Sequence, residues 1–162
     1  MKIWTRIRNS NVKQFFKLSL LLAKHPLLII PTLDATKHTF ELCTSFYGNN
    51  HGKSNKGNAF RHSLWNALIC KKSLKRIKNK QKSVFWAQKV TDLYEMVTQN
   101  NTLDEQMDLQ NNAVGRLYFL NFTDKDESEM IHFIWEKSKV AEKIRKTEDI
   151  KKYPSNMVYI VD

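Results

Sequence analysis

Apolar residues recur along most of this chain at intervals of three and four positions. The recurrence divides the sequence into segments at about 11–24, 31–47, 58–72, 83–99, 103–120 and 123–146. Residues three or four apart share one face of an α-helix, so each segment is predicted to be a helix with a buried side. The pattern therefore predicts an all-α fold, a single compact domain of five to six helices over residues 1–162.

Prolines, a loop and a run of charges mark the predicted helix ends. Pro26 ends the first helix, and Pro31 suits the first turn of the second. Residues 48–57 form the clearest loop, and the basic run Lys71–Lys82 is predicted to connect two helices. The tail at 157–161 is expected to be a short strand or a docked terminus. The low counts of 4 glycines and 3 prolines argue against a sandwich of strands and turns.

The N-terminal region lacks the features of a signal peptide or a membrane span. Lysines and prolines interrupt its apolar run, and no small-residue cleavage site follows. We therefore expect a soluble, cytoplasmic protein with Cys43 and Cys70 as reduced core thiols. The helix at 11–24 also has lysines between its apolar positions, so a peripheral contact with an anionic membrane is the alternative. A core helix is favoured, because residues 18–22 are apolar nearly all round.

Positive charge is concentrated in the middle of the chain. The formal net charge is +11, and the stretch from Leu42 to Thr91 has eleven Lys or Arg and no Asp or Glu. Thirteen of the sixteen acidic residues lie between Asp92 and Asp149. A basic stripe is typical of an anionic partner, so Lys71–Lys82 is the predicted contact with a membrane surface or nucleic acid. This run has no aromatic residues to stack on bases, which favours a solvated surface over specific nucleic-acid binding.

The candidate chemistry begins with a polar stripe on the predicted helix at 58–72. Asn58, His62 and Asn66 are spaced four apart and share one face, and Arg61 lies beside them. The rest of this segment is largely apolar, so the helix is expected to be buried. Polar side chains on a buried helix need partners, which other helices must then supply.

Two later helices carry suitable partners. Asp92 and Glu95 are three apart on one, and Asp108 and Asn112 are four apart on the next. Gly115 costs a helix about 1 kcal/mol relative to alanine, which indicates close packing against another helix or a bound group. We therefore predict that an imidazole, carboxylates, carboxamides and guanidinium groups meet at one place.

This constellation allows two interpretations. In the first, His62 is a general base or a metal ligand, and Glu95 or Asp108 orients it or shares the metal. The side chains then predicted to bind substrate are Arg61, Asn66, Asn111, Asn112 and Arg116. In the second, arginines and carboxylates form a buried network that only specifies packing, and spacing alone favours this. No zinc, phosphate-loop or nucleophile-elbow motif is present, so the identity of any metal or cofactor stays open.

Three motifs in this region occur in a fixed order. Asn58–His62 reads N-A-F-R-H, Tyr94-Glu95 follows on the next helix, and Met107–Arg116 reads M-D-L-Q-N-N-A-V-G-R. Residues 57–120 resemble a bacterial domain family of unknown function with the pattern N-A-x-R-H, H-E and M-D-x-x-N-N-x-x-G-R. The family occurs as stand-alone proteins and at the C-terminal ends of toxin-like polypeptides. The resemblance implies importance for Arg61, His62, Glu95, Asp108, Asn111, Asn112 and Arg116.

The resemblance also has one departure. Tyr94 stands where the family pattern has a histidine, so if that histidine is a ligand or a base in the family, the site of this protein is altered or inactive. The toxin-like context suggests hydrolysis by association. The functional hypothesis is therefore a hydrolase acting through His62, Glu95 and Asp108. The alternative is a non-catalytic basic protein that binds an anionic membrane or nucleic acid. His51, in the loop at 48–57, is expected to be either a surface histidine, which is favoured, or a group that closes over the site.

Overall fold

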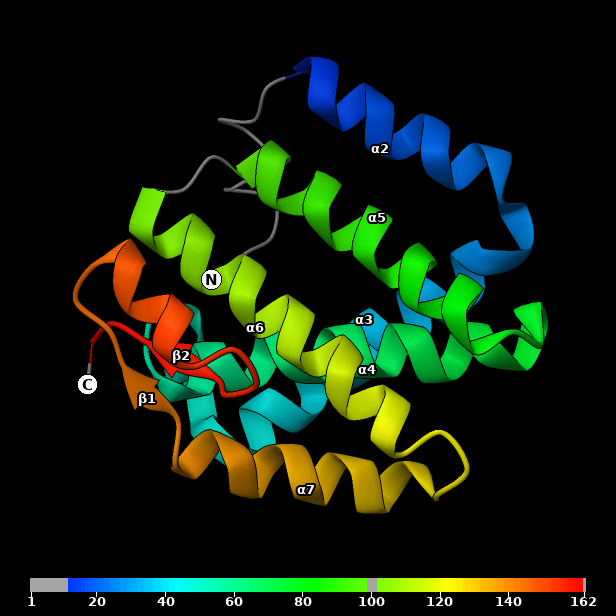
Figure 1. Ribbon diagram of the computed structural model, residues 1–162. Helices are drawn as coiled ribbons and strands as arrows, with labels where there is room; N and C mark the ends of the chain where they lie inside the picture. Colours follow the sequence, from blue (N-terminus) through cyan, green and yellow to red (C-terminus); the bar gives the residue numbers. More distant parts are fainter. Residues whose placement is uncertain (1–11, 99–101, 162) are drawn as a thin grey trace.

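The computed structural model describes residues 12–98 and 102–161. This part of the chain consists of six α-helices, two short 3₁₀ helices and two strands of two residues (Figure 1). The elements are α2 (Val12–Lys24), α3 (Pro26–Tyr47), η1 (Gly48–Gly52), α4 (Lys56–Ile77), α5 (Lys80–Thr98), α6 (Thr102–Asn121), α7 (Glu127–Lys139), β1 (Glu142–Lys143), η2 (Thr147–Lys152) and β2 (Val158–Tyr159). The predicted compact all-α fold is confirmed.

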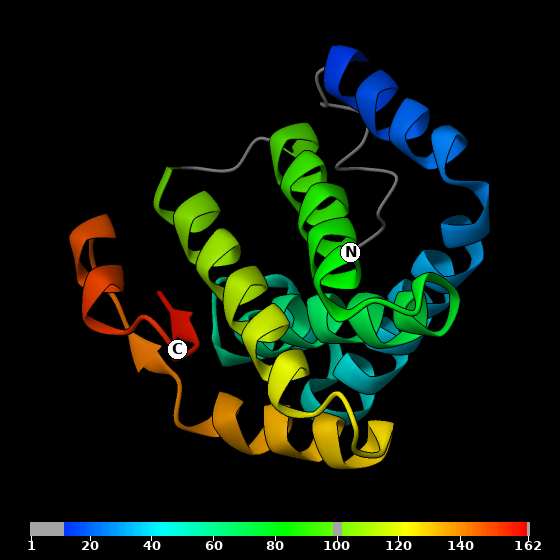
Figure 2. The same cartoon turned by 45° about the vertical axis from the view of Figure 1, so that its right-hand side comes forward.

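Helix α4 forms the centre of the fold. It packs against α3, α5, α6 and α7, while α2 packs on α5. Figures 1 and 2 both show α5 and α6 lying side by side across α4. More than half of the α4 residues are buried, including Phe60, Leu64 and Leu68 at helical spacing. Because α4 is covered by neighbours on several sides, its polar side chains face other helices.

The start of the second helix differs from the prediction. Helix α3 begins at Pro26, directly after the break that ends α2, and Pro31 lies inside it. A proline near the start of a helix removes only one backbone hydrogen bond. Pro31 is one of the buried residues of α3, so its ring packs on the side of the helix that faces the core.

The basic run Lys71–Lys82 is not a loop, so that part of the prediction was wrong. Helix α4 continues to Ile77 and α5 begins at Lys80. Lys78 and Asn79 separate the two helices, and Lys78 turns the chain, with φ of 56° and its backbone N–H donated to the Leu74 carbonyl. Lysine and arginine are good helix formers, so a run of them extends a helix as readily as it interrupts one.

The last predicted helix was too long at both ends. Helix α7 spans only Glu127–Lys139, with Asp126 as its N-cap residue, whereas 123–146 was predicted. Ile144 lies just after strand β1, which pairs in parallel with β2 in the register Glu142↔Val158. Ile144 is fully buried beside Met107 and Val158, so it serves the core from an extended segment. The tail alternative of a short strand is confirmed.

The helices of the described residues and the two cysteines bear on the predictions about a membrane span and about core thiols. Among the described residues no single helix is long and apolar enough to cross a bilayer; Phe16–Lys24 and Pro26–Gly52 pass that test only as a pair, bent by 118°. Cys43 and Cys70 are both free and buried. Burial raises the pKa of the Cys43 thiol to about 12, so the thiol stays protonated.

Candidate active site

Three helices bring the three predicted catalytic side chains into contact. His62 comes from α4, Glu95 from α5 and Asp108 from α6, and all three are buried. Glu95 Oε1 lies 3.2 Å from His62 Nδ1, and Asp108 Oδ1 lies 3.3 Å from His62 Nε2. The imidazole therefore lies between two carboxylates that are 13 residues apart in sequence but on different helices.

The Nδ1 side of the ring is held by Glu95 and Asn112. Asn112 Oδ1 lies 3.1 Å from His62 Nδ1, and Asn112 Nδ2 donates to Glu95 Oε1 at 3.1 Å. Asn66 Nδ2 donates to the same Asn112 oxygen at 2.7 Å, which fixes the orientation of that carboxamide. An ionised carboxylate and a carbonyl oxygen both accept hydrogen bonds, so the proton of the ring belongs on Nδ1.

The Nε2 side of the ring faces Arg61 and Asp108. Arg61 Nη2 lies 2.8 Å from His62 Nε2 and also donates to Asn58 Oδ1. Asn58 Nδ2 in turn donates to Asp108 Oδ1 at 2.8 Å. A guanidinium group can only donate, so in the contact with Arg61 the Nε2 atom is the acceptor. This tautomer is inferred from the hydrogen-bond pattern.

The two carboxylates have opposite electrostatic environments. Burial acts to raise the pKa of Glu95, but hydrogen bonds from His62 and Asn112 and the positive charge that His62 carries when it is protonated outweigh burial and lower that pKa. Burial raises the pKa of Asp108, and the neighbouring Glu95 charge raises it further against the effect of His62. Two carboxyl groups with pKa values pushed apart are typical of acid–base sites.

Further polar side chains hold in place the residues that contact His62. Arg116 Nη1 donates to Asn66 Oδ1 at 2.8 Å, and Thr91 Oγ1 donates to the same oxygen at 3.2 Å. Thr91 was missed in the sequence, although it lies one turn before Glu95 on the same helix face. Asp92 does not join the cluster, but its charge opposes the lowering of the Arg116 pKa by burial. Asn66 and Arg116 thus bond to other groups of the protein, and Asn66 Nδ2 also donates to the His62 carbonyl at 3.1 Å.

Close contact between α4 and α6 sets the geometry of the centre. A Cβ on Gly115 would lie 2.1 Å from the Ser63 carbonyl oxygen, so the two backbones meet at this glycine. Ser63 Oγ donates to the Asn111 carbonyl at 2.9 Å across the same contact. The expectation that Gly115 marks close helix packing is confirmed.

Asn111 serves a different element. Its Nδ2 donates to the Val158 carbonyl at 2.8 Å, and its Oδ1 accepts from the Val158 backbone N–H at 2.9 Å. The side chain therefore behaves as an extra strand partner for β2 and is engaged away from His62. No signal in the sequence separates this role from that of its neighbour Asn112.

A small cavity leads to the imidazole. Its volume is about 100 Å³, and its lining comes from α3, α4 and α5: Thr36, Thr39, Phe40, Arg61, His62, Trp65 and Tyr94. Arg61 and His62 are the only two of the predicted site residues among these lining side chains. Pockets that hold a whole drug-sized ligand have volumes of ~300 Å³ or more. This cavity is smaller, so it suits only the reacting end of a substrate.

Two further residues lie near this cavity. Tyr94, which replaces the histidine of the resembled pattern, lies in the cavity wall with its ring edge-on to Trp65 at 5.1 Å. His51 lies edge-on to Phe40 at 5.8 Å, is partly exposed, and is not among the side chains that line the cavity. Burial and the nearby Arg61 charge lower the pKa of His51.

His62, Glu95 and Asp108 could also offer ligand atoms to a metal ion. One atom from each lies within 4.8 Å of the others. Nitrogen and carboxylate ligands suit zinc or manganese. The Arg61 guanidinium, however, contacts Nε2 directly and places a positive charge where an ion would bind. The donor set therefore fits a divalent cation only if Arg61 moves away.

The fold and this cluster together define an all-α domain with a buried histidine–carboxylate centre. A family model described as a domain of unknown function (DUF6973) matches residues 19–142. The chain belongs to this family. No curated protein and no solved structure matches the chain.

Proposed function

We propose that this protein is a hydrolase in which His62 activates a water molecule at the inner end of the cavity. The observation that supports this best is the placement of His62. Its ring lines the cavity, Glu95 holds Nδ1, and Nε2 faces Arg61 and Asp108. A carboxylate that fixes one ring nitrogen while the other accepts a proton is the arrangement used in general-base catalysis.

The proposed reaction is the hydrolysis of an ester with an anionic group near the scissile bond. Nε2 of His62 takes a proton from water while the water oxygen bonds to the electrophilic carbon or phosphorus. The bond to the leaving oxygen then breaks, and the proton on Nε2 passes to that oxygen. Arg61 moves from Nε2 to the negative charge that develops on the substrate.

The other side chains have supporting roles in this proposal. Glu95 is a positioning residue, because it keeps the ring proton on Nδ1. Asp108 stabilises the imidazolium formed when Nε2 is protonated. The predicted substrate contacts of Asn66, Asn111, Asn112 and Arg116 become positioning roles, since their side chains bond within the protein. Resemblance to domains of bacterial toxin-like polypeptides adds support, and two buried free thiols suit a cytoplasmic location.

The test is a screen of the purified full-length chain against chromogenic carboxylic esters, phosphomonoesters and phosphodiesters. His62→Gln, which keeps a polar side chain of similar size, is expected to lower kcat by about 100-fold or more with little change in KM. The matched control is His132→Gln, at an exposed histidine on α7. Thermal unfolding of every variant separates loss of activity from loss of fold.

Two results would overturn the proposal. The first is wild-type protein that hydrolyses none of the three substrate classes. The second is an activity that His62→Gln and His132→Gln retain equally. A large fall in Tm for His62→Gln without any catalytic activity in the wild type would instead establish the network as a packing device.

A further inference from the structure

The first half of α3 has an apolar stripe that no other element of the described residues covers. Leu27, Ile30 and Leu33 lie on successive turns and are 77%, 73% and 61% exposed. Their neighbours Leu28 and Pro31 are buried, so the opposite side of the helix faces the core. Single exposed apolar residues are ordinary, whereas three in a row on one helix mark an interaction surface.

Basic residues lie beside this stripe. Figures 1 and 2 both place the corner between α2 and α3 next to the turn between α4 and α5. Leu27 and Arg76 line the same hollow of about 330 Å³ at this junction, together with Lys24. Lys75 and Lys78 are exposed on the same α4 end. The apolar stripe is therefore continuous with a cationic surface.

Within the part of the chain that the structure describes, acidic side chains neutralise only some of the positive charge at this end. Lys72 pairs with Asp34 at 2.8 Å, and Lys80 pairs with Asp124 at 3.2 Å. Lys75, Arg76 and Lys78 make no ion pair with any acid in the described ranges 12–98 and 102–161. The carboxylates nearby are thus already engaged, and the remaining cations face solvent.

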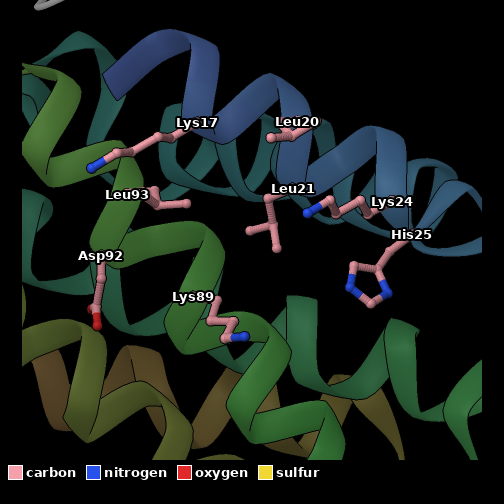
Figure 3. A pocket seen from close by; sticks show the side chains of 8 residues that line it. All are labelled: Lys17, Leu20, Leu21, Lys24, His25, Lys89, Asp92 and Leu93. Carbon is pink, nitrogen blue, oxygen red and sulfur yellow. The ribbon is translucent and has the colours of Figure 1, made fainter. Parts of the chain in front are cut away.

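The groove between α2 and α5 also combines apolar and basic side chains. Figure 3 shows Leu21 and Leu93 between the two helices, and Leu20 and three lysines also line the groove. The groove has a volume of about 480 Å³, and Lys24 lines both this groove and the hollow beside Leu27. Asp92 is the one acid that lines it, and its charge acts on Arg116. An apolar floor with a cationic rim suits a molecule with an acyl chain and an anionic headgroup.

We propose that Leu27, Ile30, Leu33, Lys75, Arg76 and Lys78, hereafter the corner surface, dock the protein on an anionic lipid bilayer. The aliphatic side chains enter the headgroup region while the cations contact lipid phosphates and carboxylates. A symmetric contact between two copies would bring the same unpaired cations together, which disfavours a dimer. Nucleic acid would leave the aliphatic stripe in water, because bases stack on aromatic side chains and the stripe has none.

The docking proposal is tested by co-sedimentation of the full-length chain with vesicles, a readout independent of any hydrolase activity. Binding is expected to vesicles of phosphatidylcholine with phosphatidylserine, to be absent with phosphatidylcholine alone, and to weaken as salt is raised. Each lysine or arginine near such a surface contributes about fivefold in affinity. Lys75→Gln/Arg76→Gln/Lys78→Gln should therefore bind roughly 100-fold more weakly.

The apolar part of the corner surface has its own variant and control. Leu27→Asn/Ile30→Asn/Leu33→Asn should lose binding at salt concentrations where the wild type still binds. Val140→Asn changes an apolar residue that is 67% exposed elsewhere, and Lys151→Gln removes an exposed charge; both should bind like the wild type. Thermal unfolding confirms that each variant folds.

Several outcomes would overturn the docking proposal. One is no binding to the anionic vesicles at low salt, and another is equal binding by the wild type and the asparagine variant. A dimer detected by light scattering that the asparagine variant abolishes would assign the corner surface to a second copy. Binding to duplex or single-stranded DNA in preference to vesicles would assign the cations to nucleic acid.

Discussion

Replacing Gly115 by alanine tests the contact on which the candidate active site depends. The added Cβ would lie 2.1 Å from the Ser63 carbonyl oxygen and 2.7 Å from the Ser63 carbonyl carbon and Cα. These are backbone atoms of a central helix, so they cannot move aside as a flexible side chain can. Ordinary contact begins at 3.4 Å, so α4 and α6 must separate by about 1.3 Å at this point.

The expected loss of stability follows from two opposing effects. Overpacking a rigid contact costs about 1–3 kcal/mol or more, and a clash with backbone belongs at the upper end. Alanine recovers about 1 kcal/mol of helix propensity. The net loss is therefore about 2 kcal/mol, which lowers Tm by roughly 4–8 °C in a chain of this size. Separation would also lengthen the bond from Ser63 to the Asn111 carbonyl and loosen the contacts of neighbouring His62.

The assay is thermal and urea unfolding followed by circular dichroism, with Gly52→Ala as the matched control. A Cβ at Gly52 would meet no atom within 4 Å, so the same chemical change is expected to leave stability unchanged or raise it slightly. If Gly115→Ala were as stable as Gly52→Ala, α4 and α6 would not be in backbone contact, and the reasoning about the site would fail.

Three further predictions concern the site. Glu95 has a pKa below its ordinary value of 4.5, so it stabilises the fold above that pH and this stabilisation is lost as the pH falls through the lowered pKa. Asp108 has a raised pKa, so its ionisation destabilises the fold as the pH rises. Scanning calorimetry at neutral pH should therefore show a lower Tm for Glu95→Gln than for the wild type. The Tm of Asp108→Asn should equal or exceed that of the wild type. Tyr94→His places an imidazole in the cavity wall and is expected to increase hydrolysis in the ester screen, and an unchanged rate would show that this histidine is dispensable. Zinc or manganese should not raise the Tm of the wild type but should raise that of Arg61→Ala, because the guanidinium no longer contacts His62 Nε2.

Much of the candidate site could be predicted because helical spacing is local geometry. Asn58, His62 and Asn66 are four apart, so any helix through them puts them on one face. A buried polar stripe must find partners, which pointed to the carboxylates of the next two helices. The order of contacts could not be predicted, because it depends on how α5 and α6 cross α4.

Asn111 and Asn112 show why the contacts of individual side chains could not be predicted. They are adjacent and chemically identical, yet Asn112 holds the imidazole while Asn111 bonds the Val158 backbone. The rotation of α6 about its axis decides which of them faces α4, and the close contact at Gly115 fixes that rotation. Thr91 was overlooked because a threonine on a helix has no distinctive pattern until its partner Asn66 is in place.

The sequence by itself determined the helices and the polar face of α4, because both follow from the periodicity of neighbouring residues. It did not determine that Lys71–Lys82 is helical apart from one turn, since lysine suits helix and loop alike. Only the tertiary structure placed Leu27, Ile30 and Leu33 outside the core beside unpaired cations, and Glu95 beside His62. Burial and ion pairing depend on which distant segments pack together, and packing is a property of the whole fold.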